Sequence, residues 1–294
     1  MADTVVLLPP DQREPLQRAY RTAVAARRRT VAAGLAVALA AAVLAAVGSE
    51  VDPFKFAANF HRLPDYVVSI TPPLTRANLG DDLTEWFWDL EGWLRLLVDT
   101  LLMAYVGTLA GGVAALGLCF PASANLEPRW WVRGAIRRVM EFCRTVPEMV
   151  FALLFVVAFG LGPLPGVLAI AIHTAGALGK LFAEAVENID MKPVEGAIAT
   201  GATRLVAIRF AVLPQVFSNL ASYALLRFEI NVRSAAVMGF VGAGGIGQDL
   251  MVAIRKFYYS DVSAILVLII SAVVAIDIIT ERLRHRLIGW ESRR

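Results

Sequence analysis

Long apolar runs alternate with polar, Arg-rich segments along the whole chain. Six runs reach or approach the roughly 20 residues that a helix needs to cross a ~30 Å hydrocarbon core. They lie at residues 31–47, 94–120, 147–161, 163–182, 213–241 and 262–279. The runs are rich in helix formers and lack the alternating pattern of a membrane barrel. The sequence therefore predicts an all-α integral membrane protein with about six transmembrane helices.

The composition agrees with a bilayer as the solvent. Hydrophobic residues make up 57% of the chain and the mean hydropathy is +0.62, well above a soluble domain. The net charge of +3 comes from arginines between the apolar runs, not from a basic face, so we expect no nucleic-acid partner. Cys119 and Cys143 have no Cys-x-x-Cys or Cys/His spacing, so we expect no disulfide and no metal.

The positive charges give an orientation. They gather before the first run, between the second and third, after the fourth and after the sixth. The residues concerned are Arg13, Arg18, Arg21, Arg27, Arg28, Arg29, Arg129, Arg133, Arg137, Arg138, Arg144, Lys180, Lys192, Arg204, Arg209, Arg282, Arg284, Arg286, Arg293 and Arg294. By the positive-inside rule these segments are cytoplasmic. We therefore expect a multi-pass protein of the cytoplasmic (inner) membrane with both termini inside.

The same pattern divides the chain into segments. We expect a cytoplasmic N-terminal segment at 1–30, a first transmembrane helix at 31–47, an outer loop at 48–93, a core transmembrane domain at 94–282 and a cytoplasmic tail at 283–294. The first apolar run could instead belong to a signal peptide. It is longer than a usual signal-peptide core, and about thirty residues precede it, so a retained helix is favoured.

A long polar segment at residues 184–214 separates the fourth and fifth apolar runs. Pro193 is placed to open a short helix, because its missing N–H costs nothing in a first turn. Gly201 is placed to end that helix in a left-handed conformation. The segment thus predicts a short helix on the cytoplasmic face.

This segment resembles the EAA loop of ABC importer permeases, whose pattern is Glu-Ala-Ala, three residues, Gly, nine residues, Ile, any residue, Leu-Pro. The chain agrees at Glu195, Ala197, Gly201, Leu213 and Pro214, and departs at Gly196 and Ala211, where Ala and Ile are usual. The resemblance implies that the short helix docks on an ATPase subunit and transmits its closure to the membrane helices. The residues implied in this coupling are Glu195, Gly196, Ala197, Gly201, Ala202 and Arg204.

Further motifs resemble the phosphonate importer permeases, at residues 144–148, 160–163, 173–176, 179–190 and 241–247. This likeness runs from about residue 144 to 279, and the first ninety residues carry none of it. It implies a type I ABC importer transmembrane domain that moves phosphonate, with phosphate and phosphite left open. The implied partners are an ATPase dimer that holds ATP and Mg, an extracytoplasmic substrate-binding protein, and a second permease copy or a paralogue.

Charged residues inside the fifth apolar run need partners, because an unpaired charge in a bilayer is costly. Glu229 and Arg233 are four residues apart and can pair, which would leave Arg227 as surplus positive charge for a passing anion. An equally weighted alternative is a structural network. The candidates for the pathway or gate are Arg227, Glu229, Arg233, His173, Gly242, Gly244 and Gly245.

Other functions are less well supported by the residues. The chain has no Walker A pattern, so we expect no ATP hydrolysis and no bound cofactor in this subunit. An intramembrane enzyme would need a nucleophile and a base at one depth, and a secondary transporter would usually show an inverted repeat. Neither is evident, although another small solute such as an amino acid remains an alternative substrate.

Overall fold

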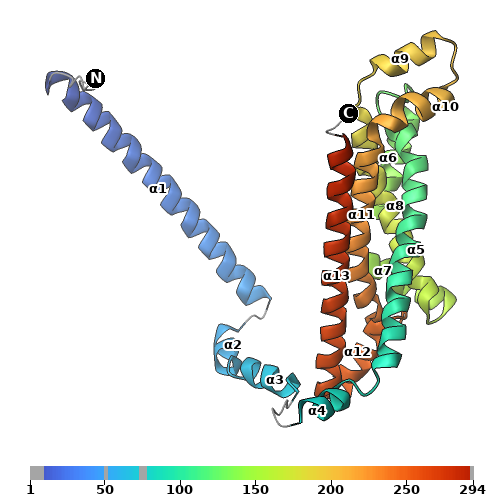
Figure 1. The fold of residues 1–294 in the computed structure, drawn as a ribbon. Coiled ribbons are helices and arrows are strands. Elements are labelled where there is room, and N and C mark those ends of the chain that lie inside the picture. Colours follow the sequence, from blue (N-terminus) through green and yellow to red (C-terminus); the bar gives the residue numbers. More distant parts are fainter. Residues whose placement is uncertain (1–9, 50–51, 73–77, 292–294) are drawn as a thin grey trace, which may run out of the picture. The chain divides into compact units, whose positions relative to one another are not determined.

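The computed structural model describes residues 10–49, 52–72 and 78–291 as a series of helices (Figure 1). The chain divides into two compact units, Met1–Val67 and Val68–Arg294. The expected segments 1–30 and 283–294 extend to residues 1–9 and 292–294, which lie outside the described part.

The first unit contains α1 (Pro10–Gly48), α2 (Pro53–Asn59) and most of α3 (Arg62–Ile70). Residues Glu14–Gly48 of α1 are long and apolar enough to cross a membrane, and no residue of the most apolar window is buried by protein. The expected helix at 31–47 is therefore present, inside a helix that starts much earlier. Phe54 and Phe56 of α2 are exposed, so the expected outer loop contains helices with apolar surfaces.

The second unit is a helical bundle. Its elements are α4 (Leu79–Trp86), α5 (Leu90–Ala122), α6 (Trp130–Thr145), α7 (Glu148–Phe159), α8 (Pro163–Glu187), α9 (Lys192–Ala199), α10 (Arg204–Ala207), a π-helical turn (Ile208–Val212), α11 (Leu213–Met238), a 3-10 turn (Gly239–Val241), α12 (Ile246–Arg255) and α13 (Tyr259–Glu291). In Figure 1, α5, α8, α11 and α13 run along the bundle, with α9 and α10 at one end and α4 and α12 at the other.

The number of membrane spans agrees with the sequence, but the third span has a different form. The described residues include five helices that could cross a membrane, or six if the bent pair α6 and α7 counts as one span. The expected third span at 147–161 coincides with α7, but these 12 residues reach only ~18 Å of a ~30 Å core, so α7 alone is too short to cross it. The pair bends by 85°. Pro147 lies at the break and disfavours a helical conformation for the preceding Val146, which is extended.

Glycines let α5 and α8 approach until their backbones nearly touch. A Cβ atom on Gly111 would lie 2.6 Å from the carbonyl oxygen of Ala171 and 2.6 Å from the Cβ of Thr174. One on Gly107 would lie 2.6 Å from the Cγ2 of Ile170. Lipid supplies no hydrophobic drive for helix association, so such close packing of small residues is what holds these helices together.

The opposite side of α8 meets α6 in the same way. A Cβ atom on Gly176 would lie 2.6 Å from the carbonyl oxygen of Met140 and 2.8 Å from the amide nitrogen of Arg144. Three apolar clusters then fill the bundle in order along α5. They contain Trp93 towards the α12 end, Ala104 in the middle and Ala115 towards the α9 end.

We predict that Gly111→Leu destabilises the bundle, because the added side chain meets the α8 backbone. The expected cost is about 1–3 kcal/mol or more, as for other overpacked cores. Gly117→Leu is the matched control, since it lies on the same helix and a Cβ there meets nothing within 4 Å. Thermal unfolding of both variants in detergent tests this. Equal melting temperatures for the two variants would contradict the packing argument.

Candidate functional site

The short helix α9 ends as the sequence predicts. Gly201 has a φ of +86°, the left-handed conformation that glycine adopts at little cost. The Gly201 amide donates to the Ile198 carbonyl at 2.9 Å and the Ala202 amide donates to the Ala197 carbonyl at 3.1 Å. These two bonds form a Schellman motif, which satisfies carbonyls that the helix end would otherwise leave free. Pro193 lies in the first turn, also as expected.

The side chains of α9 are mostly exposed. Val194 is buried, at 2% exposure, and packs into the apolar cluster at this end of the bundle. Glu195 and Gly196 are exposed, and Ala197 is half-buried against the same cluster. The helix is thus fastened by one face and presents the other face outward.

The remaining coupling candidate, Arg204, begins α10 and reaches back to the loop between α5 and α6. Its guanidinium donates to Glu127 at 3.1 Å and to the Leu126 carbonyl. Sequence reasoning did not single out Glu127, which precedes α6 and is 77 residues away from Arg204.

A polar cluster lies at the break between α6 and α7. Arg227 of α11 lies 3.5 Å from Glu148, the first residue of α7, and also donates to His173 of α8. Its Nε lies 3.4 Å from the Thr174 hydroxyl. The expectation that Arg227 is surplus positive charge is therefore wrong, because Glu148 balances it.

His173 links this cluster to the end of α6. Its Nε2 lies 3.1 Å from the carbonyl oxygen of Arg144, which the break leaves without a partner in the helix. Its Nδ1 faces the Arg227 guanidinium, a donor without acceptor capacity. The same Nδ1 lies 3.6 Å from the Glu148 carboxylate. Glu148 in turn accepts from the Ser234 hydroxyl, so α6, α7, α8 and α11 all meet here.

A second layer of polar side chains is fully enclosed. Asn231 has 0% exposure, and its amide donates to Thr108 at 2.8 Å and to Thr174 at 2.9 Å. These bonds join α11 to α5 and α8. Because buried amides and hydroxyls are costly when unpaired, this layer fixes the register of the three helices.

Arg233 and Glu229 form the ion pair that their spacing predicts. Asp277 of α13 joins them, 3.6 Å from Arg233. The side chains of Arg233 and Asp277 are 50% and 43% exposed, in contrast to 12% for Arg227. The charged candidates therefore separate into an enclosed cluster around Arg227 and an accessible one around Arg233.

The candidate gate glycines lie in a packed junction near the α12 end. Gly242, Gly244 and Gly245 all have positive φ values, between 78° and 84°, which side-chain-bearing residues rarely adopt. The Gly242 carbonyl accepts from the Gly162 amide at 3.1 Å, in the turn before α8. The Thr100 hydroxyl accepts from the amide of Ile246 at 2.9 Å. The loop thus joins α5, the α7–α8 turn and α12, and a gating role stays a prediction.

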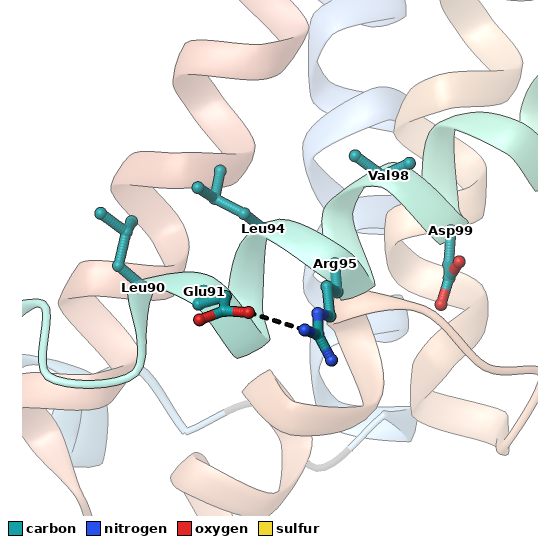
Figure 2. Close-up of a pocket in the computed structure, with 6 residues that line it drawn as sticks. All are labelled: Leu90, Glu91, Leu94, Arg95, Val98 and Asp99. Atoms are coloured by element: carbon teal, nitrogen blue, oxygen red, sulfur yellow. Dashed lines mark hydrogen bonds and ion pairs between the residues drawn. The ribbon is translucent and has the colours of Figure 1, made fainter.

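An open groove elsewhere carries no comparable chemistry. Figure 2 shows that its lining comes from successive turns of α5, and the residues are Leu90, Glu91, Leu94, Arg95, Val98 and Asp99. Glu91 and Arg95 pair with each other at 2.6 Å and are both largely exposed. In the part of the chain that the structure describes, no three His, Cys, Asp or Glu side chains are grouped to hold a metal.

Comparisons with known proteins agree with this architecture. The family model described as "binding-protein-dependent transport system inner membrane component" matches residues 94–289. The phosphite transport system permease protein PtxC of Stutzerimonas stutzeri is 43% identical over 205 residues, 70% of this chain and 74% of that protein. The putative cryptic phosphonate transport system permease protein PhnE2 of Escherichia coli (strain K12) is 54% identical over 121 residues, 41% of this chain and 99% of that protein.

A solved structure shows the same fold. A chain of the MetNI methionine ABC transporter, in an inward facing conformation, superposes with a TM-score of 0.57 at 21% identity. The match covers 67% of this chain and 98% of that one. The expected type I importer fold is therefore confirmed. This chain belongs to the family of binding-protein-dependent transport system inner membrane components, the membrane-spanning permease subunits of ABC importers.

Proposed function

We propose that this permease imports phosphorus oxyanions, a class that includes phosphite, phosphate and phosphonates. The names of the two similar permeases support this class, since one belongs to a phosphite system and the other to a putative phosphonate system. The substrate would be delivered by an extracytoplasmic binding protein and would enter the cytoplasm by alternating access.

The observation that carries the coupling proposal is the geometry of α9. The helix is fastened to the bundle through Val194, is closed by a Schellman motif at Gly201, and leaves Glu195 exposed for a partner. We assign this surface to an ATPase subunit, which binds ATP and Mg and whose closure pushes α9. Under this proposal α9 and both termini lie on the cytoplasmic side, and two ATPase subunits serve two permease copies or a permease and a paralogue.

We assign the translocation path to the accessible charged face and not to the enclosed cluster. Arg227 is engaged by His173, Thr174 and Glu148 and has little free surface for a ligand. Arg233 is half exposed within a membrane-spanning helix, where contact with lipid would be costly. This supports a position of Arg233 in a water-lined path or against the second permease copy.

Reconstitution tests the substrate class. The permease, its ATPase and the binding protein from the same system are placed in proteoliposomes, and uptake of phosphite, phosphate, methylphosphonate and methionine is measured. We expect ATP-dependent uptake of at least one phosphorus oxyanion and none of methionine. Uptake of methionine alone would refute the substrate class and favour an amino-acid importer, whereas uptake without ATPase would refute coupling.

We predict that Gly201→Val separates ATP hydrolysis from transport. A β-branched residue disfavours a φ of +86°, so the end of α9 is displaced. Gly201→Asn should retain much of the activity, because Asn tolerates the left-handed region. Gly134→Ala on α6 is the control, since it lies outside the coupling segment and a Cβ there meets nothing within 4 Å. Transport per ATP hydrolysed is the measurement, and a wild-type ratio in Gly201→Val would refute the assignment.

We predict that substitutions of Arg233 and Arg227 impair different properties of the permease. Arg233→Gln should lower transport while assembly and basal ATP hydrolysis survive. Arg227→Gln should lower assembly, because it leaves Glu148 unpaired at a cost of roughly 3–5 kcal/mol for a broken buried pair. The double variant Glu148→Gln with Arg227→Gln should recover assembly.

Size-exclusion profiles and uptake rates distinguish these outcomes. The double variant Glu229→Gln with Arg233→Gln removes both charges of the accessible pair. If it assembles without transporting, the path assignment is supported. If it transports at the wild-type rate, the pair is only structural.

A further inference from the structure

The loop between α5 and α6 holds the start of the cytoplasmic segment that carries α9. The Asn125 side chain donates to the Val186 carbonyl at 2.8 Å, and the Ala124 amide donates to Glu187 at 2.6 Å. Arg137 of α6 also pairs with Glu187. The end of α8 is thereby fixed to the end of α5 and to α6.

The same loop holds the other end of that segment through Glu127. The Glu127 side chain has only 3% exposure, although it lies outside the apolar spans. It accepts from the Arg129 amide at 3.1 Å, from the Arg129 Nε at 2.9 Å and from Arg204 at 3.1 Å. Arg204 also donates to the Leu126 carbonyl, so its guanidinium spans two successive residues of the loop.

The Glu127 carboxyl is ionised, which favours its contacts with Arg129 and Arg204. The side-chain and backbone hydrogen bonds from Arg129, assisted by Arg204, lower the pKa of the Glu127 carboxyl to about 2. The Glu127 carboxyl is therefore ionised at neutral pH. A depressed folded-state pKa also means that this contact stabilises the fold above the ordinary pKa of a glutamate and is lost only in strong acid.

The contact between Arg204 and Glu127 lies between α9 and the α5–α6 loop, where it can transmit a displacement of α9. Between Asp190 and Arg204, α9 is attached to the bundle by buried Val194 and half-buried Ala197, and its other side chains are exposed. At the α8 side, Gln215 of α11 exchanges two hydrogen bonds with the Asp190 backbone, at 3.1 and 3.2 Å. At the α10 side, Arg204 bonds to Glu127, and this bond links the segment to the loop between α5 and α6. A displacement of α9 can therefore reach α5 directly, and not only through the chain connection to α11.

We propose that Glu127 is a positioning residue for coupling, which ties Arg204 at the end of the α9 segment to the α5–α6 loop so that these helices move together. The proposal rests on the proposed role of α9 as the ATPase contact. It goes beyond that role by naming a residue outside the α9 segment that transmits the movement.

A double-mutant cycle tests the proposal in the reconstituted transporter. The variants are Glu127→Gln, Arg204→Gln and the two combined, with Arg138→Gln as the control for an exposed α6 arginine, which pairs with Glu141 at 2.6 Å. We expect each single change to lower transport per ATP hydrolysed by roughly 3- to 30-fold, with assembly and basal ATP hydrolysis retained. The combined variant should be no worse than either single change, because both remove the same contact.

The outcomes separate this proposal from the role of α9. If Gly201→Val is uncoupled but Glu127→Gln has the wild-type ratio, Glu127 does not transmit the movement and α9 keeps its role. Fully additive effects at Glu127 and Arg204 would likewise overturn the contact. If Gly201→Val is fully coupled, the role of α9 itself fails.

A second comparison covers the case in which Glu127→Gln does not assemble. Arg204→Lys keeps a positive charge near Glu127, whereas Arg204→Gln removes it. We expect Arg204→Lys to retain a higher transport-to-hydrolysis ratio than Arg204→Gln. Equal ratios for these two variants would overturn the proposal.

Discussion

The close approach of α8 to α5 and α6 is the constraint on which the rest of the bundle depends. Gly107 and Gly111 face α8 from α5, and Gly176 faces α6 from α8, each at a distance that a larger residue could not occupy. In a bilayer, where apolar side chains gain nothing by leaving lipid for one another, this proximity supplies the packing energy and sets the register. Thr174, which contacts Gly111 of α5, also accepts a hydrogen bond from the Asn231 side chain of α11 at 2.9 Å.

The polar interior explains how a broken span is tolerated. A break inside a membrane exposes the last carbonyls of one helix and the first amides of the next. At the α6–α7 break, His173 contacts the carbonyl oxygen of Arg144. Glu148 lies in the first turn of α7, where the helix dipole favours its negative charge. Arg227 then balances Glu148. One cluster thus contacts a carbonyl at the end of α6 and pairs the charges of Glu148 and Arg227, and its members have little surface left for a substrate.

The end of the bundle that carries α9 has a different character. Beside its apolar cluster it has several charged contacts, in contrast to the enclosed amides and hydroxyls of the middle. Glu187 pairs with Arg137 of α6, and Glu127 pairs with Arg204 of α10, so charged contacts link the loops and helices at this end. The permease therefore combines a tightly packed interior with a partly exposed, charged end, which is where we propose that the ATPase subunit docks.

The sequence alone determined the features that depend on neighbouring residues. Hydropathy located the spans, Pro193 and Gly201 bounded α9, and the four-residue spacing paired Glu229 with Arg233, because helix starts, left-handed caps and same-face pairs are local properties. Tertiary structure decided what depends on distant segments. It supplied Glu148 as the partner of Arg227, 79 positions earlier in the chain, and Glu127 as the partner of Arg204. It also set the size of the bend at Pro147, 85°, and buried most of the glycine loop. No local pattern encodes these contacts, because they exist only once the glycines of α5 and α8 have brought the helices together.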